Sequence, residues 1–262
     1  MTHRNARKSP PKTDSPRKIG LARALSKLGY CSRQHAAQLI RQGKVRLNGS
    51  IPKNPETPVR LGTDRIEVQG QSLKPAEKIY LMLNKPRGII TSVADEKGRD
   101  TVYSLLPPDQ TWLAPVGRLD KGSEGLLLLT NDSQWNARVT DPETHLDKTY
   151  HVQINAIADS RLIESLERGV KTERSEILRC KRASLLRTGE KNSWLEITLD
   201  EGKNRQIRRI LEALGLEALG LEVLRLIRVS IGSLQLGDLP KSAHRPLTPA
   251  ELTSINRSMN SV

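Results

Sequence analysis

The stretch Val116-Gly-Arg-Leu-Asp-Lys-Gly-Ser-Glu-Gly-Leu-Leu-Leu-Leu-Thr-Asn-Asp132 constrains the fold more than any other part of this chain. Its four consecutive leucines predict a buried strand or a short buried helix, which periodicity alone does not distinguish. Gly117, Gly122 and Gly125 give the preceding segment the backbone freedom typical of a loop. Asp120 is therefore expected on a tight loop at the edge of a core element. It is either a catalytic carboxylate or a turn aspartate that hydrogen-bonds its own backbone.

Length and composition exclude several classes of protein. The 262 residues suffice for one large domain or two ordinary ones. No apolar run approaches the length of a membrane span and no signal-peptide pattern occurs, so we expect a cytoplasmic protein without membrane contact. Cys31 and Cys180 have no CxxC partner and are expected to be reduced thiols. The five histidines are scattered, which argues against a metal site, and no glycine-rich nucleotide-binding pattern is present.

The net charge of +14 is concentrated in the first part of the chain. Residues 1–75 hold 16 Lys and Arg against 4 Asp and Glu, whereas residues 76–262 hold 27 against 25. A small basic module attached to a nearly neutral body indicates a part that docks on a polyanion and a larger part with another task.

The basic part divides into an arm and a small folded unit. Residues 1–16 lack apolar periodicity and are expected to form a disordered arm, either a solubilising tail or a phosphate contact. Residues 17–29 and 32–43 predict two helices, each closed by glycine. Residues 44–49 predict a strand that ends in an Asn-Gly turn, and residues 59–68 predict a further strand pair.

Residues 17–75 contain the run Leu21…Leu25…Leu28-Gly29…Ser32-Arg33…Ala36…Ile40…Gly43…Val45…Leu47-Asn48-Gly49. This run resembles the alpha-L RNA-binding motif. The resemblance implies that the two helices lie on structured RNA. The basic residues expected to contact phosphates are Arg17, Lys18, Arg23, Arg33, Arg41 and Lys44. Charged helices are often only solvated faces, but the excess of basic residues favours RNA here.

The remaining chain predicts a strand-rich unit. Residues 79–83 form a buried strand that leads into a loop, on which Pro86 and Gly88 present Lys85 and Arg87. Residues 146–154 alternate in polarity. Further strands are expected at residues 177–186, 193–199, 223–232 and 234–236, with a helix at 161–169, a short helix at 101–106 and a capped turn at 248–252.

A second basic cluster follows one of these strands. The segment Glu201-Gly-Lys-Asn-Arg-Gln-Ile-Arg-Arg-Ile-Leu211 predicts a helix whose first turns carry Arg205 and Arg208 on one face. Basic residues in a first turn oppose the helix dipole, so stability alone does not favour them. A nearby anion, either phosphate or the Asp120 carboxylate, would account for them.

Four motifs occur in a fixed order: Gly117-Arg-Leu-Asp120, Lys148-Thr-Tyr150, Gly202-Lys-Asn-Arg-Gln-Ile-Arg208 and Leu226-Ile-Arg-Val-Ser-Ile-Gly232, with Asn84-Lys-Pro-Arg-Gly88 ahead of them. In this order they resemble the motifs of RsuA-like ribosomal RNA pseudouridine synthases. The resemblance covers residues 17–252. It implies an α+β protein: an alpha-L domain at residues 17–75, a mostly antiparallel catalytic domain at residues 78–252, and a tail at residues 253–262.

The resemblance also implies the chemistry. Such enzymes detach uracil from its sugar, turn it and rejoin it through carbon five, with the target uridine flipped out of the RNA. Asp120 matches the essential aspartate, which acts as nucleophile or as base, and Arg208 pairs with it and keeps it ionised. Tyr150 matches the tyrosine that stacks on the base, although a strand tyrosine is commonly core. The resemblance assigns the substrate pocket to Arg118, Lys148 and Leu226, and RNA contacts also to Lys85 and Arg205. It implies no metal and no cofactor.

One departure from the family pattern is a tandem repeat. Glu212-Ala-Leu-Gly-Leu216 recurs at once as Glu217-Ala-Leu-Gly-Leu221. Five added helical residues would rotate the following chain by about 140°. We expect instead that Gly215 or Gly220 ends the helix and the surplus forms a loop. Otherwise the strand of Leu226 would shift its register.

Two other functions remain open at this point. A non-catalytic ribosome-assembly factor would keep the RNA grip but usually lose Asp120 or Arg208, and both are present. A methyltransferase would need a glycine-rich cofactor-binding segment, and the sequence has none. We expect a monomer that acts on ribosomal RNA or a pre-ribosomal particle. Large-subunit RNA is preferred, because residues 117–121 and 205–209 resemble those of the large-subunit enzymes of the family.

Overall fold

The computed structural model describes residues 18–92, 98–108, 111–217 and 221–260 of the chain. It divides into two compact units, Met1–Pro75 and Ala76–Val262. In the described part of the chain, no helix is long and apolar enough to cross a membrane. The expected disordered arm and Arg17 lie outside the described residues.

The N-terminal unit consists of two helices and short strands. Its elements are β1 (Ile19–Gly20), α1 (Leu21–Lys27), α2 (Arg33–Arg41), β2 (Val45–Leu47), β3 (Pro58–Val59), β4 (Ile66–Val68) and β5 (Gln71–Ser72). Ser32 caps α2 by accepting a hydrogen bond from the His35 amide. The Asn48-Gly49 turn has positive φ at both residues, as a tight hairpin turn requires.

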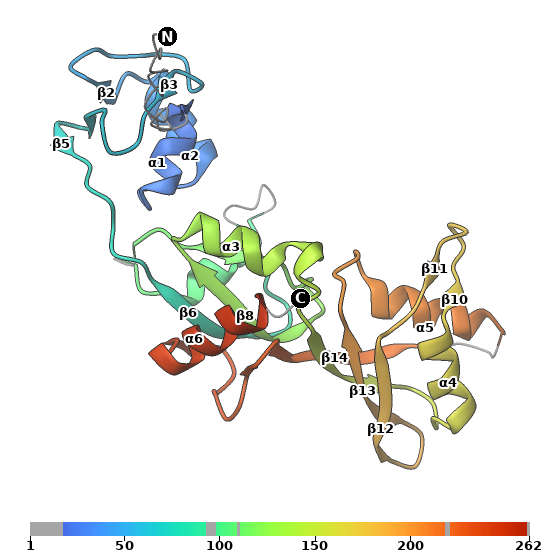
Figure 1. Ribbon diagram of the computed structural model, residues 1–262. Coiled ribbons are helices and arrows are strands. Elements are labelled where there is room, and N and C mark those ends of the chain that lie inside the picture. The colour runs from blue at the N-terminus through green and yellow to red at the C-terminus, as the bar shows by residue number, and fades with distance from the viewer. Residues whose placement is uncertain (1–17, 93–97, 109–110, 218–220, 261–262) are drawn as a thin grey trace, which may run out of the picture. The chain divides into compact units, whose positions relative to one another are not determined.

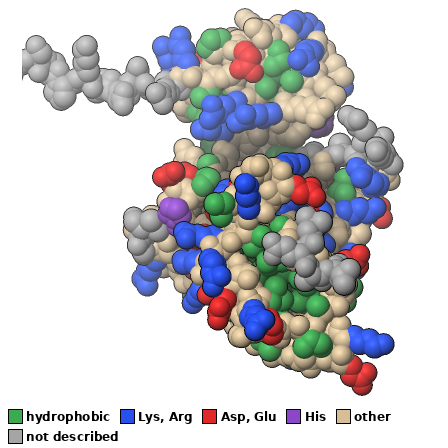
Figure 2. All heavy atoms as spheres, turned by 90° about the vertical axis from the view of Figure 1, so that its right-hand side faces the viewer, with side chains coloured by type: hydrophobic (Ala, Val, Ile, Leu, Met, Phe, Trp, Pro, Cys, Tyr) green, Lys and Arg blue, Asp and Glu red, His purple; other side chains and the backbone are tan. Residues whose placement is uncertain are grey.

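The apolar positions of α1 and α2 form the core of this unit together with Val45, Val59 and Ile66. The expected pairing between the two strands of residues 59–68 is wrong. β3 pairs with β1 and β4 pairs with β2 and β5, because each strand buries its apolar residues against the helices. Lys and Arg side chains lie at the surface of the unit, as Figure 2 shows.

The second unit is built on a nine-stranded sheet with helices beside it (Figure 1). Its strands are β6 (Tyr80–Lys85), β7 (Ala114–Val116), β8 (Glu124–Thr130), β9 (Lys148–Ile154), β10 (Val170–Lys171), β11 (Ile177–Leu178), β12 (Arg182–Thr188), β13 (Ser193–Leu199), β14 (Val223–Ile231), β15 (Leu234–Gln235) and β16 (His244–Pro246). Its helices are η1 (Val102–Leu105), α3 (Ser133–Thr140), η2 (Pro142–Thr144), α4 (Ser160–Arg168), α5 (Gln206–Glu217) and α6 (Pro249–Ser258).

The strand order in the large sheet is β12-β13-β9-β14-β8-β6-β16, with β15 on β14 and β7 on β8. All neighbours are antiparallel except β14 and β8, which run parallel. The fold is therefore α+β with a mostly antiparallel sheet, as the sequence predicted. In Figure 1, α3 and α6 lie beside β6 and β8, and α4 and α5 lie near the other end of the sheet.

The four leucines form a strand, which decides between the two structures that periodicity left open. Leu126 and Leu128 pack into a core with Trp135, whereas Leu127 and Leu129 pack into a separate core on the opposite face. A strand that is covered on both faces has no polar side, so its sequence is continuously apolar rather than alternating.

Gly125 is required where β8 meets β14. Its φ is +100°, and a β-carbon at this position would collide with the backbone of Arg228. Only glycine allows the two backbones to approach this closely. This contact fixes the parallel register of Gly125 opposite Arg228, directly after the loop that carries Asp120.

The strand predicted at residues 177–186 is interrupted. Ile177–Leu178 pairs with β10 as a small separate hairpin, and the chain then turns to enter the large sheet at Arg182. The Cys180 amide donates to the Leu166 carbonyl at this corner. The strand prediction holds in each piece, but the predicted alternation does not hold in β12, where Leu185 and Leu186 are both exposed. The pattern also did not reveal the corner between the two pieces.

The C-terminal segment is not a tail. Residues 253–259 continue helix α6 and its C-terminal cap, and Ile255 and Met259 are buried in the core beside β8. Thr248 and Glu251 form a capping box, and Arg245 makes two hydrogen bonds to the Glu251 carboxylate at 2.7 and 2.8 Å.

Replacement of Glu251 by glutamine should lower the free energy of unfolding at neutral pH by about 1 kcal/mol, because the partly exposed ion pair with Arg245 is lost, whereas glutamine can still accept the Thr248 amide in the capping box. Hydrogen bonding from Arg245 lowers the pKa of Glu251 to about 2 in the folded protein. Because the folded pKa lies below the unfolded one, this stabilisation is present above about pH 4.5 and is lost as the pH falls toward 2. Urea unfolding at several pH values measures it. If the difference in unfolding free energy between wild type and Glu251→Gln did not shrink as the pH falls, this account would be contradicted.

Candidate active site

Asp120 lies on a loop whose backbone is held at five consecutive carbonyl groups; we call residues 117–123 the aspartate loop. Thr91 donates to the Leu119 carbonyl, and the Gly88 amide donates to the Lys121 carbonyl. The Lys85 ammonium donates to the carbonyls of Asp120 and Ser123, and the Ser123 amide also donates to the Asp120 carbonyl. The Arg208 guanidinium donates to the Gly122 carbonyl. A loop fixed at each of these points holds its carboxylate in one place before substrate arrives.

Lys85 is the central support of the aspartate loop. Its side chain is fully buried, and its ammonium donates to the carbonyls of Pro86, Asp120 and Ser123 at 3.1, 3.1 and 2.9 Å. Burial lowers the pKa of Lys85 to about 8, although the nearby Asp120 carboxylate opposes the shift. The expected RNA contact of Lys85 is therefore wrong, because this residue ends strand β6 and points inward instead of lying on the exposed loop.

A pocket of about 510 Å³ opens beside the aspartate loop. It is lined by every residue that the sequence assigned to catalysis or to the substrate: Arg118, Asp120, Lys148, Tyr150, Arg208 and Leu226. Arg205 also lies on its wall. The residues come from four separate segments of the chain, so the fold brings together what the sequence holds far apart.

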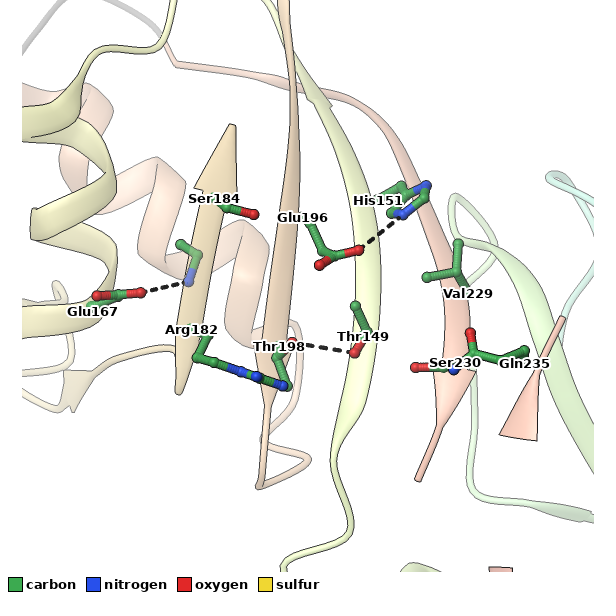
Figure 3. A pocket seen from close by; sticks show the side chains of 11 residues that line it. Thr149, His151, Glu167, Arg182, Ser184, Glu196, Thr198, Val229, Ser230 and Gln235 are labelled. Carbon is green, nitrogen blue, oxygen red and sulfur yellow. Dashed lines mark hydrogen bonds and ion pairs between the residues drawn. The ribbon is translucent and has the colours of Figure 1, made fainter. Parts of the chain in front are cut away.

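Strand β9 positions Lys148 and Tyr150 on the face of the sheet that forms this pocket. Because side chains alternate along a strand, the intervening Thr149 and the following His151 lie on the opposite face. There they line another cavity of about 490 Å³, shown in Figure 3, where His151 contacts Glu196 at 3.3 Å. This cavity contains none of the residues that the sequence assigned to catalysis, to the substrate pocket or to RNA contacts.

Arg208 lies on α5 and contacts the aspartate loop rather than the Asp120 carboxylate. Its guanidinium donates to the Gly122 carbonyl at 3.1 Å and to the Val223 carbonyl at 3.4 Å. Among the described residues there is no direct ion pair between Arg208 and Asp120, contrary to the expected pairing. Burial is the main cause that lowers the pKa of Arg208, and Asp120 acts in the opposite direction, so the two charges still interact across the pocket.

Arg205 is not in the helix, and the predicted shared face with Arg208 is wrong. Helix α5 begins at Gln206, and Arg205 precedes it with a φ of +51° and an exposed side chain. The next residue, Gln206, is buried, and its side-chain amide donates to the Glu201 carboxylate and to the Arg179 carbonyl. Arg205 therefore lies at the rim of the pocket.

The tandem repeat does not displace the pocket wall. Helix α5 continues through Gly215 to Glu217, so Gly215 does not end it, and Gly220 lies outside the described residues. Leu226 pairs with Val152 of β9, is 7% exposed and lines the pocket. The register that the repeat put in question is compatible with the expected position of Leu226.

Arg228 is a pocket residue that the sequence did not single out. It is 5% exposed, its Nε donates to the Leu126 carbonyl at 2.7 Å, and it lines the pocket beside Lys148. Its Nη2 is buried and has no hydrogen-bond partner within the described part of the chain. It lies within the Leu226–Gly232 motif, but it was not assigned a role, because an arginine in an alternating strand usually faces solvent.

In the N-terminal unit, the described residues expected to contact RNA are all exposed: Lys18, Arg23, Arg33, Arg41 and Lys44. Arg33 and Arg41 stand at opposite ends of α2. Their exposure fits a phosphate-binding surface, since an Arg or Lys must reach outward to neutralise a polyanion.

Two family patterns match this chain. The family described as RNA pseudouridylate synthase matches residues 79–213, and the S4 domain matches residues 19–78. Together they cover residues 19–213, which include Asp120, Tyr150 and Arg208.

Individual relatives agree with these patterns. The chain is 37% identical to the ribosomal large subunit pseudouridine synthase B of Bacillus subtilis, over 88% of this chain and 93% of the relative. It is 32% identical to an uncharacterized RNA pseudouridine synthase of Aquifex aeolicus, over 92% of this chain and 95% of that protein. A crystal structure of a pseudouridylate synthase superposes with a TM-score of 0.63 at 30% identity, over 90% of this chain and 99% of that one.

The fold and these similarities define an isomerase that modifies RNA. The chain belongs to the RNA pseudouridylate synthase family, in the RsuA-like branch that carries an S4 domain ahead of the synthase domain.

Proposed function

We propose that this protein converts one specific uridine of ribosomal RNA, in the large subunit, into pseudouridine, with Asp120 as the essential carboxylate. The similarity to a large subunit synthase supports the substrate. The observation that carries the proposal is the aspartate loop, which fixes Asp120 at the edge of a pocket lined by Tyr150, Arg208 and Leu226. The target uridine flips out of the RNA, and its base stacks on Tyr150.

The reaction rearranges bonds without changing the composition of the nucleoside. The C1′–N1 bond breaks, the uracil turns, and a C1′–C5 bond forms. C5 then loses its proton and N1 gains one, so no electrons enter or leave and no cofactor is needed. Asp120 acts on the sugar, either as a nucleophile at C1′ or as a base that removes a sugar proton.

Mapping the product tests the proposed substrate. Large-subunit and small-subunit ribosomal RNA are incubated separately with the protein, and pseudouridine is located through carbodiimide adducts that stop reverse transcription. We expect one new stop, in the large-subunit RNA. A stop in the small-subunit RNA alone would refute the choice of subunit. If no stop appears on naked RNA or on precursor particles although both bind, the proposed activity is wrong and an assembly role is favoured.

Replacement of both Arg33 and Arg41 by glutamine should weaken RNA binding and reduce the slope of log affinity against log salt by about 2, because each arginine neutralises about one phosphate. The rate at saturating RNA should be unchanged, since neither residue lies in the pocket. Filter binding at several salt concentrations measures the slope. A matched control replaces Arg161 and Arg168 of α4, which are also exposed, and should leave it unchanged. Equal slopes for both double variants would contradict this role.

A further inference from the structure

Lys148 and Arg228 are two neighbouring cations in the pocket without a carboxylate partner. Within the described residues, neither side chain makes an ion pair, and Arg228 is anchored by its bond to the Leu126 carbonyl. The nearby Asp147 carboxylate is engaged by Lys181 at 2.8 Å. The pocket therefore contains two positive charges that nothing in the described protein neutralises directly.

This arrangement is unfavourable for folding. Burial lowers the pKa of Lys148 and Arg228 lowers it further, whereas the Asp147 and Asp200 carboxylates act in the opposite direction without a direct contact. The buried Nη2 of Arg228 also lacks an acceptor, and an unpaired buried donor costs free energy. The hydrogen bond that anchors Arg228 to the fold uses only its Nε. Anchoring therefore explains neither the unpaired Nη2 nor the presence of a second cation, Lys148, beside it.

The two cations flank the tyrosine on which the base is proposed to stack. Arg228 pairs with Tyr150 across strands β14 and β9, and Lys148 precedes Tyr150 by two residues on the same face. The exposed cations of the pocket, Arg118 and Arg205, lie at its rim. Arg228 is buried and Lys148 is half-buried. Because the RNA backbone must remain at the rim while the flipped base goes deepest, these two cations meet the base and the exposed ones meet phosphates.

We propose that Lys148 and Arg228 bind the carbonyl oxygens of the flipped uracil and stabilise the negative charge of the ring when the C1′–N1 bond breaks. The proposal rests on the proposed function. The electron pair of that bond passes to N1 and spreads over O2 and O4, until C5 attacks C1′ and gives up its proton. Asp120 acts on the sugar, whereas these two cations act on the leaving base. Donors placed where charge develops favour the transition state over the bound substrate.

The uracil supplies the acceptor that Nη2 lacks. Since Nη2 is shielded from solvent, contact requires a small rotation of the guanidinium or of the side chains that cover it. Such a contact is also reversible, which the reaction requires because the ring must turn before C5 can attack.

The test compares RNA that carries uridine at the target with RNA that carries 5-fluorouridine there. Fluorine withdraws electron density, so the detached ring is a more stable anion and needs less help from the protein. In single-turnover experiments, Lys148→Met and Arg228→Met should slow loss of the target nucleoside from uridine RNA by about 10²-fold. With 5-fluorouridine RNA, the same two substitutions should slow the reaction by only about 10-fold or less. RNA affinity should be unchanged.

Two controls separate this role from a structural one. Arg187→Met changes an arginine that lies over Trp194 and outside the pocket, and should leave both rates unchanged. Arg228→Lys keeps the charge and should restore part of the rate. Equal losses on both RNAs, or losses explained by weaker RNA binding, would overturn the proposal and indicate a structural or phosphate-binding role. If the wild type converts neither RNA, the proposed function itself has failed.

Discussion

Replacement of Asp120 by asparagine is expected to lower the single-turnover rate of pseudouridine formation by at least about 10⁴-fold, the scale on which loss of an essential nucleophile or base acts. The amide has nearly the same shape, but it can neither attack C1′ nor remove a sugar proton. The fold should be unaffected, because the hydrogen bonds that hold the aspartate loop involve the backbone of Asp120 and leave its carboxylate free to act. Nucleoside chromatography of digested RNA measures the rate.

Retention of binding is part of this prediction. The asparagine variant should bind the RNA with an affinity within about threefold of the wild type, since it retains every basic residue that is expected to contact phosphates. Asp120→Glu provides the matched control for charge. It keeps the carboxylate but moves it by one methylene, and a misplacement of about 1 Å can cost about 10²-fold. A variant that lost RNA binding together with activity would show that Asp120 supports the fold rather than the chemistry.

Replacement of Lys85 by methionine is expected to destabilise the catalytic unit by about 3 kcal/mol, because it removes the donor for three backbone carbonyls in a buried site. Activity should fall as well, since the aspartate loop loses its central support. Guanidinium unfolding of the full chain measures the stability, and the single-turnover assay measures the rate. Arg87→Met, a change at an exposed residue of the adjacent loop, is the matched control for removal of a positive charge.

The pH dependence gives this prediction a second readout. The pKa of Lys85 is about 8 in the folded protein, below its ordinary value of 10.5. Between these two values the unfolded chain binds more protons than the folded one, so Lys85 makes the wild type increasingly stable as the pH rises. The difference in unfolding free energy between wild type and Lys85→Met should therefore grow from about pH 8 to 10.5. A difference that is constant over this range would mean that Lys85 is not buried as a charged group.

The sequence predicted the elements that carry a strong local signal. The Gly-rich loop before four leucines, the capped helix after Ser32 and the alternating strand of Tyr150 all depend on patterns within about ten residues. The residues of the pocket were also predicted, because the resemblance assigned Asp120, Tyr150 and Leu226 a place that the fold then supplied.

The errors share one physical cause, which is that burial is decided by distant segments. Lys85 follows a strand and precedes Pro86, so it looked exposed, yet carbonyls nearly forty residues later surround its ammonium. Residues 253–262 were predicted to be a tail, because no local pattern shows that Ile255 packs into a core. That core is formed by residues of β8 and α3, which lie far away in the sequence. Arg228 lies in the Leu226–Gly232 motif, but only its pairing with Tyr150 across the sheet places its side chain in the pocket.

The central claim is that Asp120 catalyses uridine isomerisation in large-subunit ribosomal RNA. Release of tritium from RNA whose uridines are tritiated at carbon five tests it most directly, because this hydrogen leaves only when C5 bonds to the sugar. We predict release equivalent to one uridine per RNA molecule with the wild type and none with Asp120→Asn. Equal release by both proteins, or no release by a wild type that binds the RNA, would contradict the account.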